Sequence, residues 1–566
     1  MKKFFKIMFV LIVILFFCGI ILVTWFQLDT RVHIPEQADR SVTKLSVSNP
    51  EKDFYTCGRN WIQRGNSGLW ELYLEGKPFE RGVIEGKLTC GLLEKQEQAF
   101  TDQITELIPS HTYLKLLKYF IYWFNRDLED YIPEEYKSEI YGISLSASDK
   151  FSLIGNNYQR IMNYHLAHDI GHALQDFHMV GCTSFGVWKD KSKDGSMLIG
   201  RNFDFYIGDE FAANKIVCFE KPEKGYPFMM ITWAGMAGAV SGMNEQGLTV
   251  TINAAKSDIP YSARTPISIL AREILQYARN IREAYVIAQK RKTFVSESIL
   301  IGSAADGKAS IIEKSPYKIS LVEPQNNNIV STNHFRSATF SADPKNVKDI
   351  KENASLYRYK KMLQDITEEE PLDVAGMAKI LRDRSGLNHA DIGMGNEKAV
   401  NQLIAHHSII FEPEKCLVWV SNGPWQIGGY TCYDIVKIFH NFASLHQRTE
   451  ISETSRSISP DSFLSSDSYT QFNRFRELRK ELKKMSRPGE KTDLKRSYIP
   501  ELIGTNPGFF EVYSLAGDYF YRKNQQDSAV GYYRKALEKV IPRQSEKQKI
   551  IEKLVDCIVQ MKKKKS

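Results

Sequence analysis

Residues 7–26 form a run of 20 residues without a charged side chain, and this run limits the possible folds of the N-terminal part more than any other feature. An apolar helix of this length spans the hydrocarbon core of a bilayer, which is about 30 Å thick. Lys2, Lys3 and Lys6 precede the run, and positive charge favours the cytoplasmic side. We therefore predict a membrane anchor at residues 1–27, with the rest of the chain outside the cytoplasm in a periplasm-like space.

A cleaved signal peptide is the competing interpretation of the same run. The apolar run is long and no small-x-small cleavage site follows it, which favours an uncleaved anchor. Cys18 follows two bulky residues, Phe16 and Phe17, and more apolar sequence comes after it, which argues against a lipidated cysteine.

The composition indicates ordered domains and no nucleic-acid partner. Hydrophobic residues make up 43% and aromatic residues 12% of 566 residues, which is sufficient for two to four domains with packed cores. The net charge is +8, but part of the excess lies at the two ends, including residues 562–565, so no basic footprint remains between them. Eight cysteines exclude a disulfide-dense scaffold and leave any pairing open.

The hydrophobic period changes from helical to alternating at residue 182. Residues 182–188 alternate, Lys193-Asp194-Gly195 provides a turn, and residues 197–205 alternate again, which predicts a β-hairpin. Further strands are expected at 216–220, 227–233, 248–253, 298–301, 309–313, 317–322 and 329–332, with two helices beginning at 265 and 281. This order predicts an α+β fold of stacked sheets covered by helices.

Cys182 stands at the start of this hairpin and has two charged residues opposite it. A single cysteine at the start of a strand is usually a small buried apolar residue. Arg201 and Asp204, however, lie on the return strand, which brings them beside the start of the first strand. An arginine and a carboxylate at this point are suited to orient a thiolate or a terminal amine.

The motifs around Cys182 resemble those of the N-terminal nucleophile (Ntn) hydrolases, in the branch of choloylglycine hydrolases, penicillin V acylases and the peptidase C45 penicillin acyl-transferases. The matching elements, in the family's order, are GCTSF at 181–185, GRNFD at 200–204, GMNEQGL at 242–248, TNHF at 332–335 and SLYRYKK at 355–361. ELYLEGKPFERGVIEGK at 71–87 is similar to the segment that precedes the nucleophile in the C45 group. The resemblance implies an αββα four-layer sandwich.

The resemblance also implies that the chain cuts itself between Gly181 and Cys182. The thiol would attack the Gly181 carbonyl, which has no β-carbon beside it, and hydrolysis of the resulting thioester would free the α-amine of Cys182. That amine, with an ordinary pKa of about 7.7–8.0, takes the thiol proton without a histidine. The implied activity is cleavage or transfer of the acyl group of a linear, small-molecule amide through an acyl-Cys182 thioester, without a cofactor.

The other site roles are implied by the same motifs. Arg201 and Asp204 would position the amine and the thiol, and Asn253 and Asn333 would bind the oxyanion. Arg358 would connect these groups electrostatically. GMNEQGL also fits an ordinary hairpin turn, and Asn333 also fits a strand cap, so these alternatives remain open.

His165, His168, Asp169, His172 and Asp176 recur at helical spacing before Cys182. On a helix they share roughly one face, so a metal site is chemically possible. All of these ligands would come from one helix, and no partner on another element is identifiable. Polar packing or a helix at the cleavage junction is the preferred interpretation, and we predict no metal.

These observations divide the chain into six parts: anchor 1–27, tether 28–50, helical pro-segment 51–181 with strands near 70–74 and 81–86, catalytic part 182–445, Ser-rich linker 446–470 and helical region 471–566. The last part resembles one tetratricopeptide repeat, with Ala516, Gly517, Tyr532 and Ala536 at repeat positions, and is a candidate surface for a protein partner. The alternative function is a non-catalytic, membrane-anchored envelope protein that binds through these helices.

Overall fold

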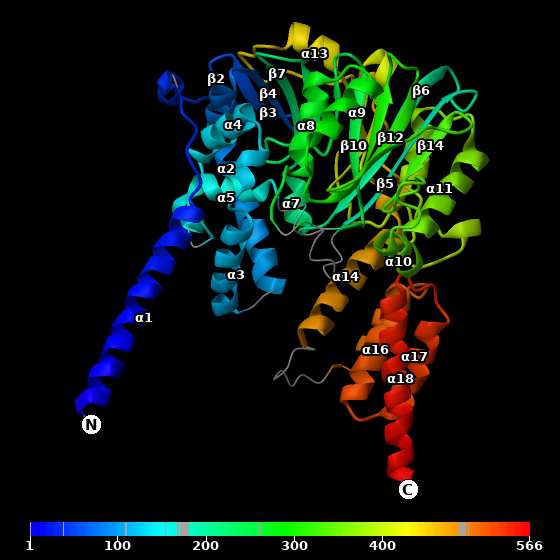
Figure 1. Cartoon of the computed structure of the whole chain (residues 1–566). Helices are drawn as coiled ribbons and strands as arrows, with labels where there is room; N and C mark the ends of the chain where they lie inside the picture. Colours follow the sequence, from blue (N-terminus) through cyan, green and yellow to red (C-terminus); the bar gives the residue numbers. More distant parts are fainter. Residues whose placement is uncertain are drawn as a thin grey trace.

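The computed structural model describes residues 2–37, 39–107, 110–152, 154–166, 169, 180–258, 260, 262–485, 494–495 and 497–565. Two sheets form the centre of the chain, one of 11 strands in the order β1-β2-β3-β4-β7-β8-β9-β10-β11-β12-β13 and one of 6 strands in the order β14-β5-β6-β15-β16-β17. Helices lie beside them, as Figure 1 shows for α8, α9 and α11. The predicted mixed α+β class is confirmed.

The strands of the larger sheet are β1 Ser48–Glu51, β2 Phe54–Cys57, β3 Asn60–Arg64, β4 Trp70–Gly76, β7 Ile216–Pro222, β8 Phe228–Thr232, β9 Ser241–Asn244, β10 Leu248–Ala255, β11 Ser296–Ser303, β12 Lys308–Lys314 and β13 Ile319–Val322. Those of the smaller sheet are β5 Val180–Lys189, β6 Gly195–Phe205, β14 Asn328–Ser331, β15 His407–Glu412, β16 Leu417–Ser421 and β17 Tyr430–Asp434. Every strand predicted after residue 181 is present within a few residues of its expected position.

The helices before the hairpin are α1 Lys2–Asp29, α2 Pro78–Leu107, α3 His111–Phe124, α4 Glu134–Ser144 and α5 Asn157–Tyr164. The middle of the chain has α7 Asp209–Ala213, α8 Ile267–Tyr277, α9 Ile281–Lys290, α10 Pro344–Glu352, α11 Ser355–Glu369, α12 Val374–Leu381 and α13 Ile435–Asn441. The C-terminal helices are α14 Asp467–Met485, α15 Tyr498–Thr505, α16 Phe510–Arg522, α17 Gln526–Leu537 and α18 Gln544–Lys565.

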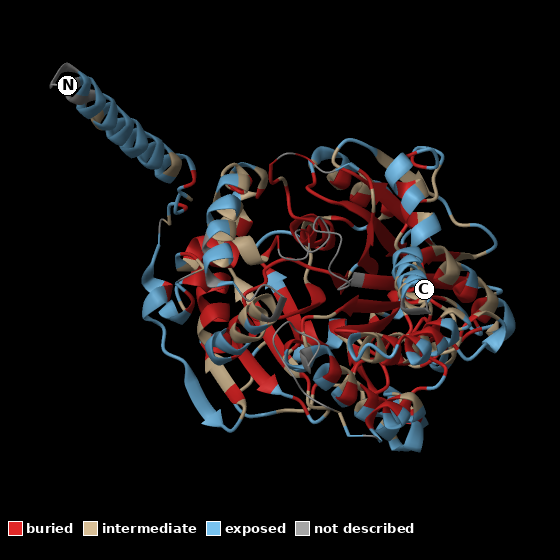
Figure 2. Ribbon diagram, turned by 90° about the horizontal axis from the view of Figure 1, so that it is seen from below, coloured by how far each residue is buried: buried red, intermediate tan, exposed pale blue. Residues whose placement is uncertain are grey.

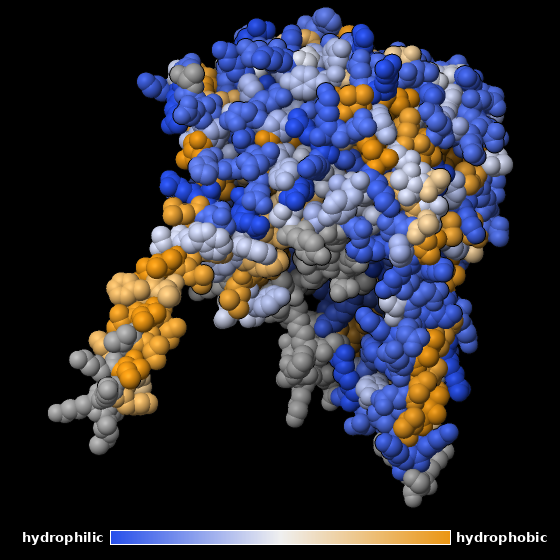
Figure 3. All heavy atoms as spheres, in the orientation of Figure 1, coloured by the Kyte–Doolittle hydropathy of each residue, from blue (hydrophilic) through white to orange (hydrophobic). Residues whose placement is uncertain are grey.

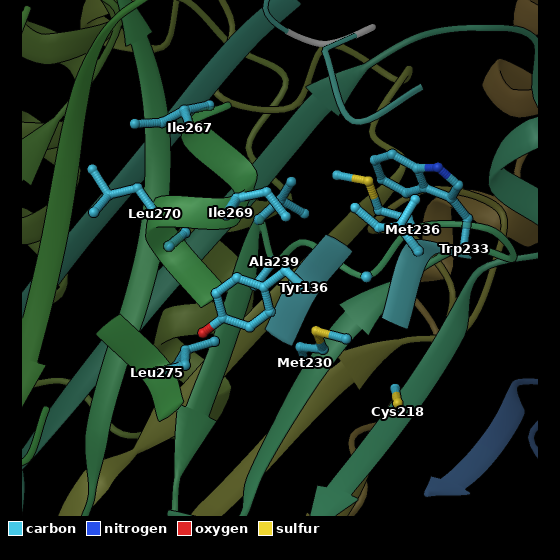
Figure 4. Close-up of a cluster of buried hydrophobic side chains, with 14 of the residues drawn as sticks. Tyr136, Cys218, Met230, Trp233, Met236, Ala239, Ile267, Ile269, Leu270 and Leu275 are labelled. Atoms are coloured by element: carbon cyan, nitrogen blue, oxygen red, sulfur yellow. The ribbon is translucent and has the colours of Figure 1, made fainter. Parts of the chain in front are cut away.

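Alternating side chains produce the layers, because successive strand residues point to opposite faces. Ile199 of β6, Phe219 of β7 and Ile409 of β15 belong to one buried cluster between the two sheets. On the outer face of the larger sheet, helix residues such as Leu270 and strand residues such as Met230 belong to one buried cluster, part of which Figure 4 shows. A third cluster packs α11 and α12 on the outer face of the smaller sheet.

The pro-segment is part of the same core rather than a separate helical domain. Strands β1 to β4 extend the larger sheet, and β4 pairs in parallel with β7, from Trp70 opposite Ile216 to Gly76 opposite Pro222. Our prediction of a strand at 81–86 is wrong, because these residues lie in α2. Pro78 starts that helix, and Ile84, Leu88 and Leu92 repeat every four residues and are buried in the core.

The segments predicted as tether and linker also make defined contacts. Residues 48–51 form β1 at the edge of the larger sheet. In the Ser-rich segment, Tyr430 and Ile458 form a β-bridge, and Gln63 Nε2 donates to the Thr449 carbonyl at 2.6 Å. Polar composition alone did not reveal these contacts, because Ser and Thr satisfy backbone groups in packed loops as well as in free linkers.

Helix α1 contains the segment Ile7–Asp29, which is long and apolar enough to cross a bilayer, a property that a signal sequence shares. Figure 2 shows it as an exposed helix projecting from a largely buried body. In the C-terminal region α16 packs on α17 and α17 on α18, with Gly517 against the ring of Tyr533. The repeat assignment of this region stays a prediction.

A cluster of buried charges joins the pro-segment to the part after residue 181. Arg81 of α2 lies 2.5 Å from Glu139 of α4 and 2.7 Å from Glu220 of β7. Arg272 of α8 contacts the same two carboxylates, and all four side chains are at most 1% exposed. Two arginines thus balance two glutamates where no solvent screens them.

Replacing Arg272 by methionine leaves the shared carboxylates with one arginine. We expect Arg272→Met to lower the free energy of unfolding by about 3–5 kcal/mol, because removing one partner of a buried ion pair leaves an uncompensated charge. Urea unfolding of the detergent-solubilised full chain measures this change. The matched control is Arg279→Met, which removes an exposed arginine paired with Glu283, and should change stability by less than about 1 kcal/mol. Equal effects of the two substitutions would contradict the assignment.

Candidate active site

The pairing of β5 with β6 brings the predicted nucleophile and its charged neighbours together. In this antiparallel register Gly181 lies opposite Asp204, Cys182 opposite Phe203, and Ser184 opposite Arg201. Arg201 Nη2 donates to the Cys182 thiol sulfur at 3.7 Å. Cys182 is fully buried.

Asn333 and Arg358 hold the backbone of Cys182 from the other side of β5. The Cys182 N–H donates to Asn333 Oδ1 at 3.0 Å. Arg358 Nη2 donates to the same oxygen at 2.6 Å, and Arg358 Nη1 donates to the Cys182 carbonyl at 2.7 Å and to Thr183 Oγ1 at 2.9 Å. The nitrogen that would become the free amine therefore already has a fixed acceptor.

The two asparagines use their amide nitrogens differently. Asn253 Nδ2 donates to Ser184 Oγ at 3.0 Å and to the Ser331 carbonyl at 2.9 Å, which occupies both of its hydrogens. Asn333 Nδ2 donates to the Ala254 carbonyl at 3.0 Å and carries a second hydrogen. Of the two, Asn333 is the better placed to donate to an added oxyanion.

Arg201 is fixed by the hairpin of β9 and β10. Its guanidinium donates to the Val240 carbonyl at 2.6 Å and also to Ser241 Oγ and the Ile252 carbonyl. GMNEQGL supplies the turn of this hairpin, where Asn244 Oδ1 accepts from the Gln246 and Leu248 N–H groups. The motif therefore acts on the site indirectly, through the strands that hold Arg201.

Burial dominates the electrostatics of the uncut site. It raises the pKa of the Cys182 thiol to about 11, although Arg201 and Arg358 act in the opposite direction. Burial also raises the pKa of Asp204 to about 8, against the same two arginines, and raises the pKa of Glu297 well above its usual range. At neutral pH the thiol is protonated, and Asp204 is largely protonated.

Gln402 is a site residue that sequence reasoning missed. Its Nε2 donates to Asp204 Oδ2 at 3.1 Å, and a Cβ added to Gly181 would lie 2.8 Å from the same nitrogen. Gly181 therefore packs closely against the end of the Gln402 side chain, which itself contacts Asp204. No motif marks Gln402, since it comes from a loop before β15, 198 residues beyond Asp204.

An apolar hollow lies just beyond Asp204 on β6. Its free space is about 420 Å³ when the solvent at its open mouth is included, but only about 30 Å³ of this admits a sphere the size of a water molecule. Its apolar walls come from α2, the end of β6, α7 and the loop after β8, namely Leu93, Phe100, Phe205, Ile207, Phe211 and Trp233. Phe205 stacks on Phe203, the strand partner of Cys182, with ring centres 5.5 Å apart. The hollow is thus one aromatic layer away from the cysteine.

His165 is a packed core histidine. Its Nδ1 hydrogen-bonds the Ile161 carbonyl at 2.9 Å, and its Nε2 accepts the Ala237 N–H at 2.9 Å. Burial lowers its pKa to about 4, so it is neutral. Asp169 Oδ2 accepts the Ile267 N–H, whereas His168, His172 and Asp176 lie outside the described residues. Within the described residues no group of three or more His, Cys, Asp or Glu is arranged to hold a metal ion.

Residues 188–423 match the sequence model of the acyl-coenzyme A:6-aminopenicillanic acid acyl-transferase family. The family prediction is confirmed over this segment. The acyl-transferase segment begins within β5, just after Cys182, and contains Arg201, Asp204, Asn333 and Arg358 as well as Asn253. It spans less than half of the chain, and the pro-segment and C-terminal helices lie outside it.

Other proteins are similar over part of the chain. An uncharacterized protein of Archaeoglobus fulgidus is 26% identical over 281 residues, which are 46% of this chain and 45% of that protein, so the match spans less than half of the relative. Among solved structures, an N-acylethanolamine-hydrolyzing acid amidase ortholog of Caenorhabditis elegans is 17% identical, with a TM-score of 0.31, over 41% of this chain and 93% of its own. A conjugated bile acid hydrolase variant of Clostridium perfringens is 14% identical, with a TM-score of 0.32, over 48% and 97%. At these scores nothing about the substrate of this chain follows from them.

The raised pKa of Asp204 predicts how the stability of the uncut chain changes with pH. An aspartate whose folded pKa is about 8 holds a proton that the unfolded chain loses near pH 4. Its stabilising contribution is complete below about pH 4 and is lost as the pH rises toward 8. In a Cys182→Ala background, which keeps the chain uncut, we compare the free energy of unfolding of the Asp204→Asn chain with that of the Asp204 chain. The difference should therefore shift in favour of the Asp204→Asn chain as the pH rises from 5 to 8.

Urea unfolding at the two pH values measures this difference. We expect the free energy of unfolding of the Asp204→Asn chain, relative to that of the Asp204 chain, to be higher at pH 8 than at pH 5 by at least about 1 kcal/mol. The control is Asp258→Asn at an aspartate whose side chain is 65% exposed, which should give no pH-dependent difference. An unchanged difference for Asp204→Asn would mean that Asp204 is already ionised at pH 5.

Proposed function

We propose that the chain cuts itself between Gly181 and Cys182 and then acts as a cysteine N-terminal nucleophile hydrolase or acyl-transferase on a linear amide. The observation that carries the proposal is the hydrogen bond from the Cys182 N–H to Asn333 Oδ1, beside the contact of its sulfur with Arg201. Any buried N–H needs an acceptor, but here the acceptor is a side-chain oxygen that Arg358 also holds. That oxygen would remain in place to orient a free amine at the same nitrogen.

The cleavage step needs no cofactor, since every bond and proton is accounted for by the chain and water. The Cys182 sulfur adds to the Gly181 carbonyl carbon, the bond from that carbon to the Cys182 nitrogen breaks, and the thiol proton ends on that nitrogen. Water then hydrolyses the thioester, which leaves a Gly181 carboxylate and a Cys182 with a free amine and a free thiol. A Cβ at position 181 would have to displace the end of the Gln402 side chain, which contacts Asp204, and this supports glycine at the position.

The same cysteine then processes the substrate. Its amine takes the thiol proton, the sulfur attacks the substrate carbonyl, and the proton passes to the departing amine as the acyl-Cys182 thioester forms. Asn333 donates to the oxyanion, and Asn253 keeps Ser184 and the end of β14 in position. Arg201 and Asp204 position the sulfur and the amine, and Arg358 holds the Asn333 oxygen. Water completes hydrolysis, or an amine completes transfer.

The apolar hollow supports an apolar acyl group on this small-molecule substrate. Most of its wall is aliphatic or aromatic, and it begins one strand residue beyond Asp204. An acyl chain that lies in it would place its carbonyl toward β5. The proposal needs neither a cofactor nor a nucleic acid.

The location follows from α1. We assign it as a membrane anchor, because the residue after it, Thr30, is buried and its carbonyl accepts a hydrogen bond from Gln159 Nε2 at 3.2 Å. A cleaved signal peptide would not need a packed residue directly after its helix. The lysines before the apolar run favour a catalytic part outside the cytoplasm. Binding of a protein partner at the C-terminal helices remains a proposal based on their sequence.

Purified protein tests the cleavage step directly. Under denaturing conditions the unmodified chain should give two fragments, residues 1–181 and residues 182–566, and Cys182→Ala should give one. Under native conditions the two fragments should remain together, since β4 and β7 belong to one sheet. Intact mass and N-terminal sequencing identify the new terminus.

The control is Cys218→Ala, at a second buried cysteine on β7, which should leave cleavage unchanged. A folded but uncut natural chain would contradict the enzyme proposal, because the amine would never be freed. The non-catalytic, membrane-anchored binding protein would then become the better interpretation.

A series of simple N-acyl amides with increasing acyl length tests the hollow. We expect kcat/KM to rise by about fourfold for each added CH2 that fits, since burying one CH2 contributes about 0.8 kcal/mol. Phe211→Ala, which removes part of the wall, should flatten this dependence and leave the shortest amide unaffected. A rate that falls with acyl length would exclude the hollow as the acyl site.

A further inference from the structure

Helix α3 presents an apolar face to solvent. Tyr113, Leu116, Tyr119, Phe120 and Trp123 are between 40% and 64% exposed. Their spacing of three, six, seven and ten residues places them on one side of the helix. An exposed apolar surface of this kind on an otherwise polar body marks an interaction site.

The opposite side of α3 is packed on the body, which fixes the direction of the exposed face. The Tyr122 hydroxyl donates to the Ile154 carbonyl at 3.2 Å. At the C-terminal end of the helix the ring of Phe124, which stacks on that of Phe120, contacts the ring of Phe294 at 5.3 Å between centres. The Ser110 side chain caps the helix by accepting the Tyr113 N–H. The exposed face thus belongs to a defined helix and not to a frayed segment.

The face lies beside the candidate membrane helix. The ring of Tyr119 contacts that of Phe26 at 6.1 Å between centres, near the C-terminal end of α1. Arg126 lies over the Trp123 ring at 4.9 Å and has its Nε 3.8 Å from Asp29 of α1. Figure 1 shows α1 and α3 extending from the same side of the body, and Figure 3 shows the apolar surface of α1 in that region.

The composition of α3 suits a lipid surface better than a protein groove. The helix has two tyrosines and a tryptophan on its exposed face, residue types that favour the boundary between hydrocarbon and headgroups. Its 14 residues include His111, Lys115 and Lys118 and no acidic residue. Basic charge without acidic charge is attracted to anionic headgroups.

We propose that the apolar face of α3 inserts into the outer surface of the lipid bilayer that α1 crosses. The proposal rests on the assignment of α1 as a membrane anchor. α1 and α3 together hold the body at two points, so that it has a fixed orientation on the membrane. Helix α2, which precedes α3 in the chain, supplies Leu93 and Phe100 to the apolar hollow, so the proposed membrane contact and the proposed acyl site come from successive helices.

Spin labels on the full-length chain in vesicles of phosphatidylcholine and phosphatidylglycerol test this arrangement. The exposed native thiols are removed by Cys18→Ser and Cys90→Ser, and single nitroxides are placed with Leu116→Cys or Phe120→Cys. These side chains are exposed, so the labels do not disturb the core. Leu15→Cys on α1 reports the membrane interior, and Tyr317→Cys, an apolar position that is 65% exposed between β12 and β13, reports water. The same background without an added cysteine gives the blank.

Collision rates with oxygen, which concentrates in lipid, and with a water-soluble nickel chelate give the result. We expect the ratio of oxygen to nickel collisions at positions 116 and 120 to be several-fold higher than at 317 and to approach that at 15. A ratio equal to that at 317, with position 15 in lipid, would overturn the α3 proposal alone. Low collision rates with both reagents would mean that protein covers the face, which also overturns it. An aqueous ratio at position 15 would instead overturn the anchor on which the proposal depends.

Discussion

The position of β5 between two partner strands determines the candidate site. β6 on one side brings Arg201 and Asp204 into register with Ser184 and Gly181, and β14 on the other leads into Asn333. A shift of one residue in either pairing would turn these side chains to the opposite face of the sheet. The cysteine is therefore positioned by sheet register, while the cores on both faces of the sheet prevent that register from changing.

Water is excluded from the environment of Cys182, so charged groups there lack solvation. Two arginines and two carboxyl groups lie near a buried thiol, and burial favours the neutral form of the thiol and of both acids. A protonated thiol of this kind is a weak nucleophile, and an amine created beside the sulfur would assist each later attack on a substrate. A free α-amine on Cys182 would thus supply the base that takes the thiol proton, a role that the neutral groups around the sulfur do not fill.

Much of this arrangement could be predicted from the sequence, because it depends on local pattern. Alternation at 182–188 and 197–205 with a turn at Gly195 fixes the hairpin, and the hairpin fixes which residues face each other. Residues 81–86 were assigned to the wrong element because a short apolar run fits both a strand and a helix, and only the fold shows that Pro78 starts α2. Gln402 was missed since its contact with Asp204 depends on the path of a loop 198 residues away. The charges of Arg81, Glu139, Glu220 and Arg272 come from four separate elements, and no spacing in the sequence connects them.

The parallel pairing of β4 with β7 affects how the molecule folds before cleavage and refolds after it. These strands lie on opposite sides of the 181–182 bond, so folding has to unite them before the site around Cys182 can form. The uncut chain can refold as a single molecule after denaturation. Once the bond is cut, the two pieces must find each other in solution, and recovery depends on their concentration. If the chain is cut after folding, its folded state depends on having folded as one chain. Unfolding followed by dilution would then destroy this state, and refolding would not readily restore it.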